Sequence, residues 1–112
     1  MFGLGKTKAH REIDAQTLME MLTEGSALLV DVREPDEFAV EHIKCAVNAP
    51  LSSFEPRDVP QVAGKTIVLQ CAGGKRSGLA LDRCASAQSH IDTHLAGGID
   101  AWKAAGLPVE RG

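Results

Sequence analysis

The chain has 112 residues, which is long enough to bury one hydrophobic core and too short for two domains. Hydrophobic residues make up 44% of it and charged residues 24%, the usual proportions of a folded globular domain, so a disordered or coiled-coil chain is excluded. The formal net charge of -3 gives no overall basic surface, so we expect no nucleic-acid partner. No apolar run reaches the ~18 residues that span a bilayer, so we expect no membrane association and a cytoplasmic location.

The three cysteines, Cys45, Cys71 and Cys84, are irregularly spaced and odd in number. They form no C-x-x-C pair and no set of paired Cys and His ligands at the spacing of a structural zinc site. This pattern disfavours both a disulfide framework and a structural zinc site. We therefore expect no metal centre.

The first elements are a helix and a buried strand. Asp14 can cap the free amides of a helix and Gly25 can end it, so the sequence predicts a helix between them. Residues 27–32, ALLVDV, form a continuous apolar run with a β-branched end. Such runs are typical of strands that helices cover on both faces, which favours a parallel sheet.

The middle of the chain predicts short elements joined by a loop. Pro35 suits the first turn of a short helix that ends near His42. Residues 45–51 predict a brief extended piece. Residues 52–65, with two prolines and a glycine, predict a connecting loop with one helical turn. Residues 66–70, TIVLQ, predict the second buried strand.

The last third of the chain predicts a long helix, a strand and a short helix. From Ser77 onward, small and apolar residues recur on one helical face. Residues 92–98, DTHLAGG, predict a short strand and a turn, and residues 99–106, IDAWKAAG, predict a final helix. Apolar strands that alternate with short helices indicate an α/β domain with a mostly parallel central sheet and helices on both faces.

The segment after the second strand is the candidate for chemistry. Ligands bind outside the carboxyl ends of the strands in an open parallel sheet, and Cys71 follows such an end. Gly73 and Gly74 can turn successive amides inward to form an anion-binding nest. The helix from Ser77 would direct its free amides to the same place. These features favour a negative charge on the sulfur.

Lys75 and Arg76 add two cations to this environment. Because the thiolate is the nucleophilic form of cysteine, the segment indicates an activated thiolate in an anion cradle. A cysteine at the end of a buried strand is, taken alone, more often a small core residue, and two glycines are more often a turn. The combination of thiol, glycines, cations and following helix is what favours a function.

Three segments of the chain carry signature-like patterns: LLVDVREPDEFAVEHI, IVLQCAGGKRSGLAL and HLAGGIDAWKAAGLPV. In this order they resemble the first signature, the active-site loop and the C-terminal signature of the single-domain rhodanese-like sulfurtransferases. The resemblance covers nearly the whole chain. It implies one rhodanese-like domain over residues 12–110, preceded by a short N-terminal extension, residues 1–11.

The resemblance also implies an activity. A sulfurtransferase of this family takes sulfane sulfur from a small anionic donor such as thiosulfate, carries it as a persulfide and passes it to cyanide, a thiol or a protein thiol. The implied catalytic residue is Cys71. The implied substrate-binding residues are the rest of its loop: Ala72, Gly73, Gly74, Lys75 and Arg76. The resemblance implies no metal or organic cofactor, because the enzyme's own thiol carries the sulfur.

Two other functions stay open. A domain of the same fold could deliver a persulfide to a partner protein or simply dock, although a docking domain has no need of an activated thiol. A phosphatase or arsenate reductase of similar fold would resemble C-x-x-x-x-x-R, whereas only four residues separate Cys71 from Arg76. The shorter loop suits a terminal sulfur better than a tetrahedral phosphate.

Other cysteines and the tryptophan have simpler interpretations. Cys45 stands where the family usually has glycine, so a backbone conformation that suits glycine must accept a side chain. We interpret Cys45 as structural or incidental, with a second thiol that resolves a persulfide as the alternative. Cys84 lies on the inward face of its helix and is interpreted as a core residue. Trp102 is predicted to anchor the core and to need a partner for its indole N–H.

Charged and histidine side chains near the strand ends are interpreted as structural. Arg33 is predicted to pair with Asp31 or Glu41 and to tie the strand end to the next helix. His42 and His94 could each act as an acid or base, but a hydrogen bond to a backbone carbonyl is the favoured interpretation of both.

Overall fold

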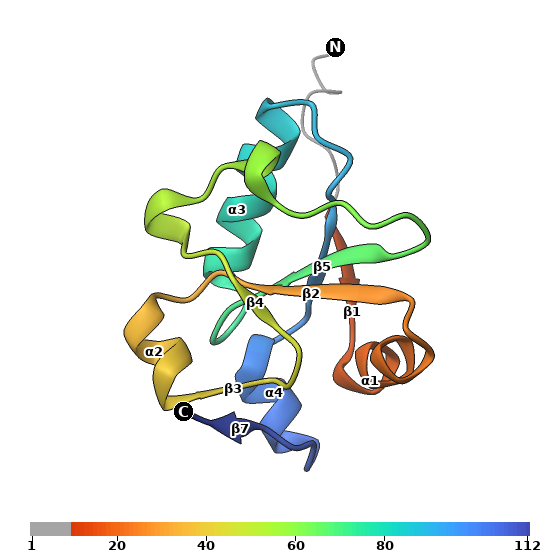
Figure 1. The fold of residues 1–112 in the computed structure, drawn as a ribbon, viewed down its shortest axis with the longest axis vertical. Helices are drawn as coiled ribbons and strands as arrows, with labels where there is room; N and C mark the ends of the chain where they lie inside the picture. The colour runs from red at the N-terminus through yellow and green to blue at the C-terminus, as the bar shows by residue number, and fades with distance from the viewer. Residues whose placement is uncertain (1–9) are drawn as a thin grey trace.

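The computed structural model describes residues 10–112, which fold around a five-stranded sheet (Figure 1). Every pairing within this sheet is parallel. In spatial order its strands are β1 (Arg11–Ile13), β6 (Thr93–Leu95), β5 (Thr66–Gln70), β2 (Ala27–Asp31) and β4 (Val47–Asn48). The predicted α/β class with a parallel central sheet is confirmed.

Helices lie on both faces of the sheet, as predicted. They are α1 (Ala15–Glu24), α2 (Pro35–Val40), α3 (Lys75–Ser86) and α4 (Gly98–Ala104). Apolar side chains of α3 pack against one face of β2 and β5, and those of α1 and α4 pack against the other face. Trp102 of α4 is buried, and its indole N–H donates to the Pro108 carbonyl at 2.8 Å, so its interpretation as a core anchor is confirmed.

The local sequence sets both ends of α1. The Asp14 carboxylate accepts a hydrogen bond from the Thr17 amide at 2.8 Å, which satisfies a free amide of the first turn. The same bond lowers the pKa of Asp14. Gly25 follows the helix with φ of 77°, a left-handed conformation that glycine adopts readily. Both predicted ends of this helix are confirmed.

The start of α3 differs from the sequence prediction. The helix begins at Lys75 rather than near Ser77. Gly74 has φ of 108°, which lets the chain leave the turn and enter the helix at once. Lys75 and Arg76 therefore belong to the first helical turn and not to the loop.

The short strands at the edges of the sheets are not predicted by the sequence patterns. The chain near His42 is extended rather than helical: β3 (Glu41–His42) pairs antiparallel with β7 (Glu110–Arg111) in a separate two-stranded sheet. β1 begins at Arg11, while most of the predicted N-terminal extension, residues 1–11, lies outside the described residues. Strands of two or three residues are too short to show a period.

The long connection between β4 and β5 contains two short 3-10 helices, Leu51–Ser53 and Pro56–Asp58, where the sequence predicts one helical turn.

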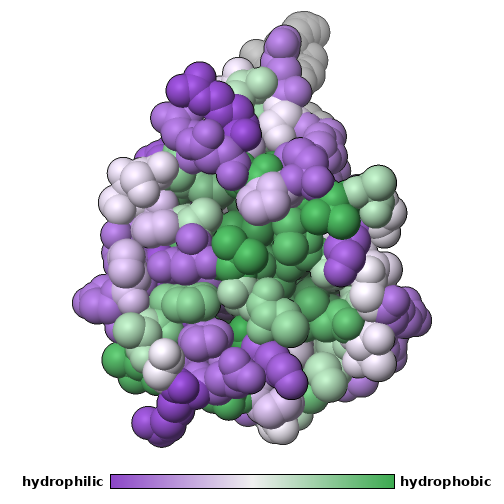
Figure 2. Space-filling view, in the orientation of Figure 1, coloured by the Kyte–Doolittle hydropathy of each residue, from purple (hydrophilic) through white to green (hydrophobic). Residues whose placement is uncertain are grey.

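Figure 2 shows apolar side chains gathered in the middle of one face, over β2 and β4, with polar residues around them. Val47 on the edge strand β4 is part of the exposed apolar surface. Among residues 10–112, no helix is long and apolar enough to cross a membrane.

Candidate active site

The predicted thiol lies in the loop that joins β5 to α3. Cys71 directly follows β5, and the loop lies between α2 and α4 (Figure 1). Cys71 is 1% exposed, and its Sγ accepts a hydrogen bond from the Gly74 amide at 3.0 Å. Because Gly74 is also the residue that caps α3, the sulfur lies at the positive end of a 12-residue helix. Both the amide and the helix favour a negative charge there.

α4 holds the backbone of the loop from the opposite side. The Ile99 amide donates to the Cys71 carbonyl at 2.8 Å, and the Asp100 amide donates to the Ala72 carbonyl at 3.0 Å. This close approach requires Gly98, because a Cβ at that position would lie 2.2 Å from the Cys71 carbonyl oxygen. The first turn of α4 therefore fixes the position of the thiol through the main chain.

The residues predicted for the site run from the loop into the first turn of α3. Gly73 and Lys75 are exposed, whereas Ala72, Gly74 and Arg76 are partly buried. The fold thus brings an exposed lysine and a buried thiol to the same end of one helix.

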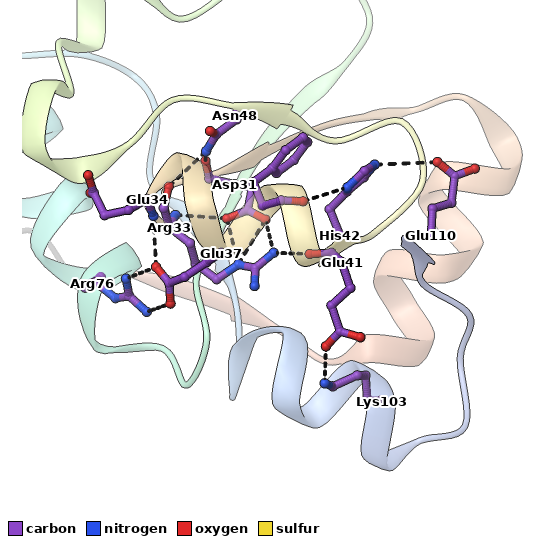
Figure 3. Close-up of polar contacts among 11 residues, drawn as sticks. Asp31, Arg33, Glu34, Glu37, Glu41, His42, Asn48, Arg76, Lys103 and Glu110 are labelled. Carbon is purple, nitrogen blue, oxygen red and sulfur yellow. Dashed lines mark hydrogen bonds and ion pairs between the residues drawn. The ribbon is translucent and has the colours of Figure 1, made fainter. Parts of the chain in front are cut away.

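Arg76 is bound to a residue that the sequence analysis did not single out. Its guanidinium donates to both carboxylate oxygens of Glu37 on α2, at 2.7 Å and 3.0 Å (Figure 3). The bidentate bond lowers the pKa of Glu37 to about 2, although burial opposes the shift, and it raises the pKa of Arg76. Arg76 therefore fastens the start of α3 to α2, and much of its charge is compensated.

The end of β2 carries a second polar network (Figure 3). The Arg33 guanidinium donates to the Asp31 carboxylate at 2.8 Å and to the Glu41 carbonyl at 2.8 Å. The predicted pairing of Arg33 with Asp31 is confirmed, and the bond to Glu41, which caps the end of α2, ties the strand end to the next helix as predicted. His42 Nδ1 lies 3.0 Å from the Phe38 carbonyl, so the predicted backbone partner of His42 is also confirmed.

The sequence analysis missed the side-chain partners of Cys71. Cys71 Sγ lies 3.6 Å from Ser77 Oγ, and this oxygen lies 2.8 Å from Nδ1 of His94. The predicted bond of His94 to a backbone carbonyl is wrong, because its side chain points from β6 toward α3 and its ring nitrogens lie next to Ser77 and Glu12. The serine in the helical turn after the thiol was a usable signal, but no spacing links it to His94.

Burial separates the two other cysteines, and all three are free thiols. Cys45 is exposed and has φ of 72°, which fits the expectation of a glycine-like conformation there. Cys84 lies on the buried face of α3, and burial raises the pKa of its thiol to about 11, so its interpretation as a core residue is confirmed. Within residues 10–112, no group of three or more His, Cys, Asp and Glu side chains is placed to hold a metal ion.

Comparison with known sequences identifies the family. The sequence model of the rhodanese-like domain matches residues 14–105. The chain belongs to the rhodanese-like domain family. A sulfurtransferase of Allochromatium vinosum is 32% identical over 99 residues, which cover 88% of this chain and 92% of that protein. An uncharacterized protein of Synechocystis is 46% identical over 103 residues, which are 92% of this chain and 58% of the longer relative.

Solved structures agree with this assignment. The crystal structure of a rhodanese-related protein from Thermoplasma volcanium matches with a TM-score of 0.73 and 30% sequence identity, over 90% of this chain and 98% of the other. The rhodanese-like fold implied by the three sequence segments is therefore confirmed.

Proposed function

We propose that this rhodanese-like domain is a sulfurtransferase that moves sulfane sulfur from a small anionic donor such as thiosulfate to cyanide or a thiol through a persulfide on Cys71. The observation that carries the proposal is the position of Cys71 Sγ, which accepts the Gly74 amide at the start of α3. A negative sulfur is stabilised there by the amide and the helix dipole. A relative that is named a sulfurtransferase and has nearly the same length supports the same chemistry.

The reaction consists of two displacements at sulfur. In the first, the Cys71 thiolate attacks the outer sulfur of thiosulfate, the S–S bond of the donor breaks, and sulfite leaves with the bonding electron pair. In the second, a nucleophilic acceptor attacks the terminal sulfur of the persulfide. The bond between the two sulfurs breaks, its electron pair returns to Cys71 Sγ, and the thiolate is restored.

The loop supplies the binding groups for the donor and for the persulfide. We assign the anionic part of the donor to the backbone amides of Ala72, Gly73 and Gly74 and to the exposed Lys75, which carries the less compensated of the two charges. Arg76 is assigned the role of holding the loop, because its guanidinium is bound to the carboxylate of α2. Only four residues separate Cys71 from Arg76, and we expect this short spacing to suit a terminal sulfur better than a phosphate.

The free thiols support a proposal for the compartment. Three free cysteines, one of them exposed, fit a reducing compartment such as the cytoplasm, where disulfides are rare. We place the proposed activity there, with a low-molecular-weight thiol or a protein thiol as the acceptor.

Steady-state turnover tests the proposal. The purified chain is mixed with thiosulfate and cyanide, and thiocyanate is measured for the wild type, Cys71→Ser and the matched control Cys45→Ser, which removes the exposed thiol. We expect initial rates with a ping-pong pattern, loss of turnover to the uncatalysed background in Cys71→Ser, and wild-type rates in Cys45→Ser. Turnover that survives in Cys71→Ser would contradict the proposal. Sulfur uptake only from a protein donor would instead identify a persulfide carrier.

A further inference from the structure

A line of polar side chains connects the buried thiol to the surface of the domain. Cys71 Sγ contacts Ser77 Oγ at 3.6 Å, and Ser77 Oγ contacts His94 Nδ1 at 2.8 Å. On the far side of the ring, His94 Nε2 lies 3.4 Å from a carboxylate oxygen of Glu12. The Glu12 side chain is 62% exposed, whereas the other three residues are buried. The line therefore leads from a closed site to water.

Strand pairing and the first turn of α3 set the positions of the residues in this line. Glu12 and His94 are direct neighbours in the parallel pairing of β1 with β6, so their side chains leave the sheet on the same face. Ser77 occupies the first turn of α3 and is fully buried. Gly78 of the same helix lies beside the imidazole, because a Cβ built there would be in van der Waals contact with the ring at 3.9 Å.

Because Cys71 is buried, its ionisation requires a group that accepts the proton and a group that stabilises the thiolate. The thiol must lose a proton before it can attack a donor, and the residue is almost closed to solvent. A buried negative charge is costly unless a positive charge or hydrogen bonds compensate it. Arg76, the nearest guanidinium in the sequence, is already bound to Glu37. A nearby group that accepts the proton of Cys71 would remove it from the thiol and would also place a positive charge close to the thiolate.

We propose that His94, acting through Ser77, holds the proton released when Cys71 becomes a thiolate, and that Glu12 stabilises the resulting imidazolium. This inference rests on the proposed function only in giving the thiolate a role. The S–H bond of Cys71 breaks as its proton binds Ser77 Oγ, and the hydroxyl proton of Ser77 moves to Nδ1 of His94. The electron pair stays on Sγ, Ser77 remains neutral, and one proton has moved to the ring.

The charges around His94 fit a proton acceptor. Burial lowers the pKa of His94 and the neighbouring His10 lowers it further, whereas the Glu12 carboxylate raises it, so Glu12 is the neighbour that favours a protonated ring. His10 faces the His94 ring edge-on at 6.0 Å and pairs with Asp82 of α3 at 3.1 Å. Glu12 is thus the carboxylate that faces the distal nitrogen of His94 directly.

The orientation of the Ser77 hydroxyl completes the path. Its oxygen lies within 3.2 Å of the Gly74 carbonyl as well as beside Nδ1, so the hydroxyl can donate to either acceptor while it accepts from the thiol. Once the proton is on the ring, Nδ1 donates to Ser77 Oγ and Ser77 donates to the thiolate. Ser77 and the Gly74 amide then both donate to the sulfur.

The rate of alkylation of Cys71 against pH tests this inference without any sulfur donor. Wild type, His94→Asn and the matched control His90→Asn are treated with iodoacetamide, and each cysteine is followed by peptide mapping. Asparagine can still accept the Ser77 hydrogen bond but cannot take up a proton. We expect the Cys71 rate in His94→Asn to fall about tenfold near pH ~6.5 and to approach the wild-type rate near pH ~9.5, where thiols ionise without help. The exposed Cys45 in the same samples should react equally in all variants.

Two results would overturn the inference. One is a His94→Asn profile that coincides with the wild type; the other is a loss by the same factor at every pH, which a purely structural role would produce. Glu12→Gln, at an exposed position that does not threaten folding, should lower the Cys71 rate about twofold to threefold in the same low-pH range, and an unchanged rate there would remove Glu12 from the proposal. A wild type that shows this pH profile but transfers no sulfur would contradict the proposed function alone.

Discussion

The ends of β2 and β5 lie side by side at one edge of the sheet, but they are built differently. Asp31 and Gln70, the last residues of these strands, are direct neighbours in the parallel pairing. At the end of β2, Asp31 and Arg33 are both buried and bind each other. At the end of β5, the buried Cys71 has an amide on one side and a line of side chains to the surface on the other.

On the proposed function, the difference between the two strand ends shows how a structural end can be told from a reactive one. Both ends carry polar side chains in the position where parallel sheets bind ligands. At β2 the opposite charges are fully compensated within the fold, so nothing remains to react. At β5 the sulfur accepts a hydrogen bond from the Gly74 amide, and the nearby guanidinium of Arg76 is bound to Glu37 instead. The proposed reactive end is thus the one whose polar group is not held in an ion pair with a neighbouring residue.

The largest effect on stability is expected from a substitution at the end of β2. Asp31→Asn leaves the Arg33 guanidinium, which is 5% exposed, without a carboxylate partner. Breaking a buried ion pair in this way should lower the free energy of unfolding by about 3 kcal/mol. Urea denaturation measures the loss. Sulfur loading of Cys71 per folded molecule should stay at the wild-type level, and a variant that is fully stable but inactive would reverse the roles of the two ends.

The next effect is expected where α4 meets the reactive loop. In Gly98→Ala the new Cβ would lie 2.2 Å from the Cys71 carbonyl oxygen, so the loop must move. We expect a loss of about 2 kcal/mol in stability, as for overpacked sites, together with at least a tenfold loss of sulfur transfer. Gly25→Ala is the matched control, because Gly25 also has a positive φ but nothing within 4 Å of its Cβ. That control should lose only about 1 kcal/mol and no activity.

A smaller effect concerns the link between α2 and α3. The pKa of Glu37 is about 2 instead of 4.5, so its pair with Arg76 stabilises the fold above pH 4.5, and this contribution disappears as the pH falls from 4.5 toward 2. Glu37→Gln should remove that part of the acid dependence. At neutral pH it should cost about 1 kcal/mol or less, because both side chains are about one third exposed. Urea denaturation of the wild type and of Glu37→Gln across this pH range gives the free energy of unfolding at each pH. If this free energy falls equally with pH in both proteins, the pair does not contribute.

The smallest effect is expected at the exposed cysteine. Cys45 has φ of 72°, a conformation that strains residues with a side chain, so Cys45→Gly should raise the free energy of unfolding by about 0.5 kcal/mol. Sulfur transfer should not change, because this thiol lies outside the reactive loop. A clear loss of transfer in Cys45→Gly would support the alternative that Cys45 resolves the persulfide.

Much of the fold could be predicted because its signals are local. The apolar runs of β2 and β5, the cap at Asp14 and the stop at Gly25 each lie within a few residues of the structure they specify. The start of α3 was misplaced by two residues because the conformation of Gly74 cannot be read from its identity alone.

The sequence is enough to propose Cys71 as the reactive thiol, but it does not reveal the side-chain partners of that thiol. Cys71, the glycines and the cations are contiguous, so their combination is visible in one short segment. Glu37 is 39 residues from Arg76, and His94 is 17 residues from Ser77. Such contacts depend on how strands and helices meet, which no spacing in one chain reveals.

The most direct test of a reactive β5 end is the mass of the protein after it is mixed with thiosulfate, followed by peptide mapping. We expect one added sulfur atom on Cys71, absent in Cys71→Ser, removed by cyanide, and not found on Cys45 or on the buried Cys84. No added sulfur on Cys71, or sulfur on Cys45 in its place, would contradict the assignment of the chemistry to the end of β5.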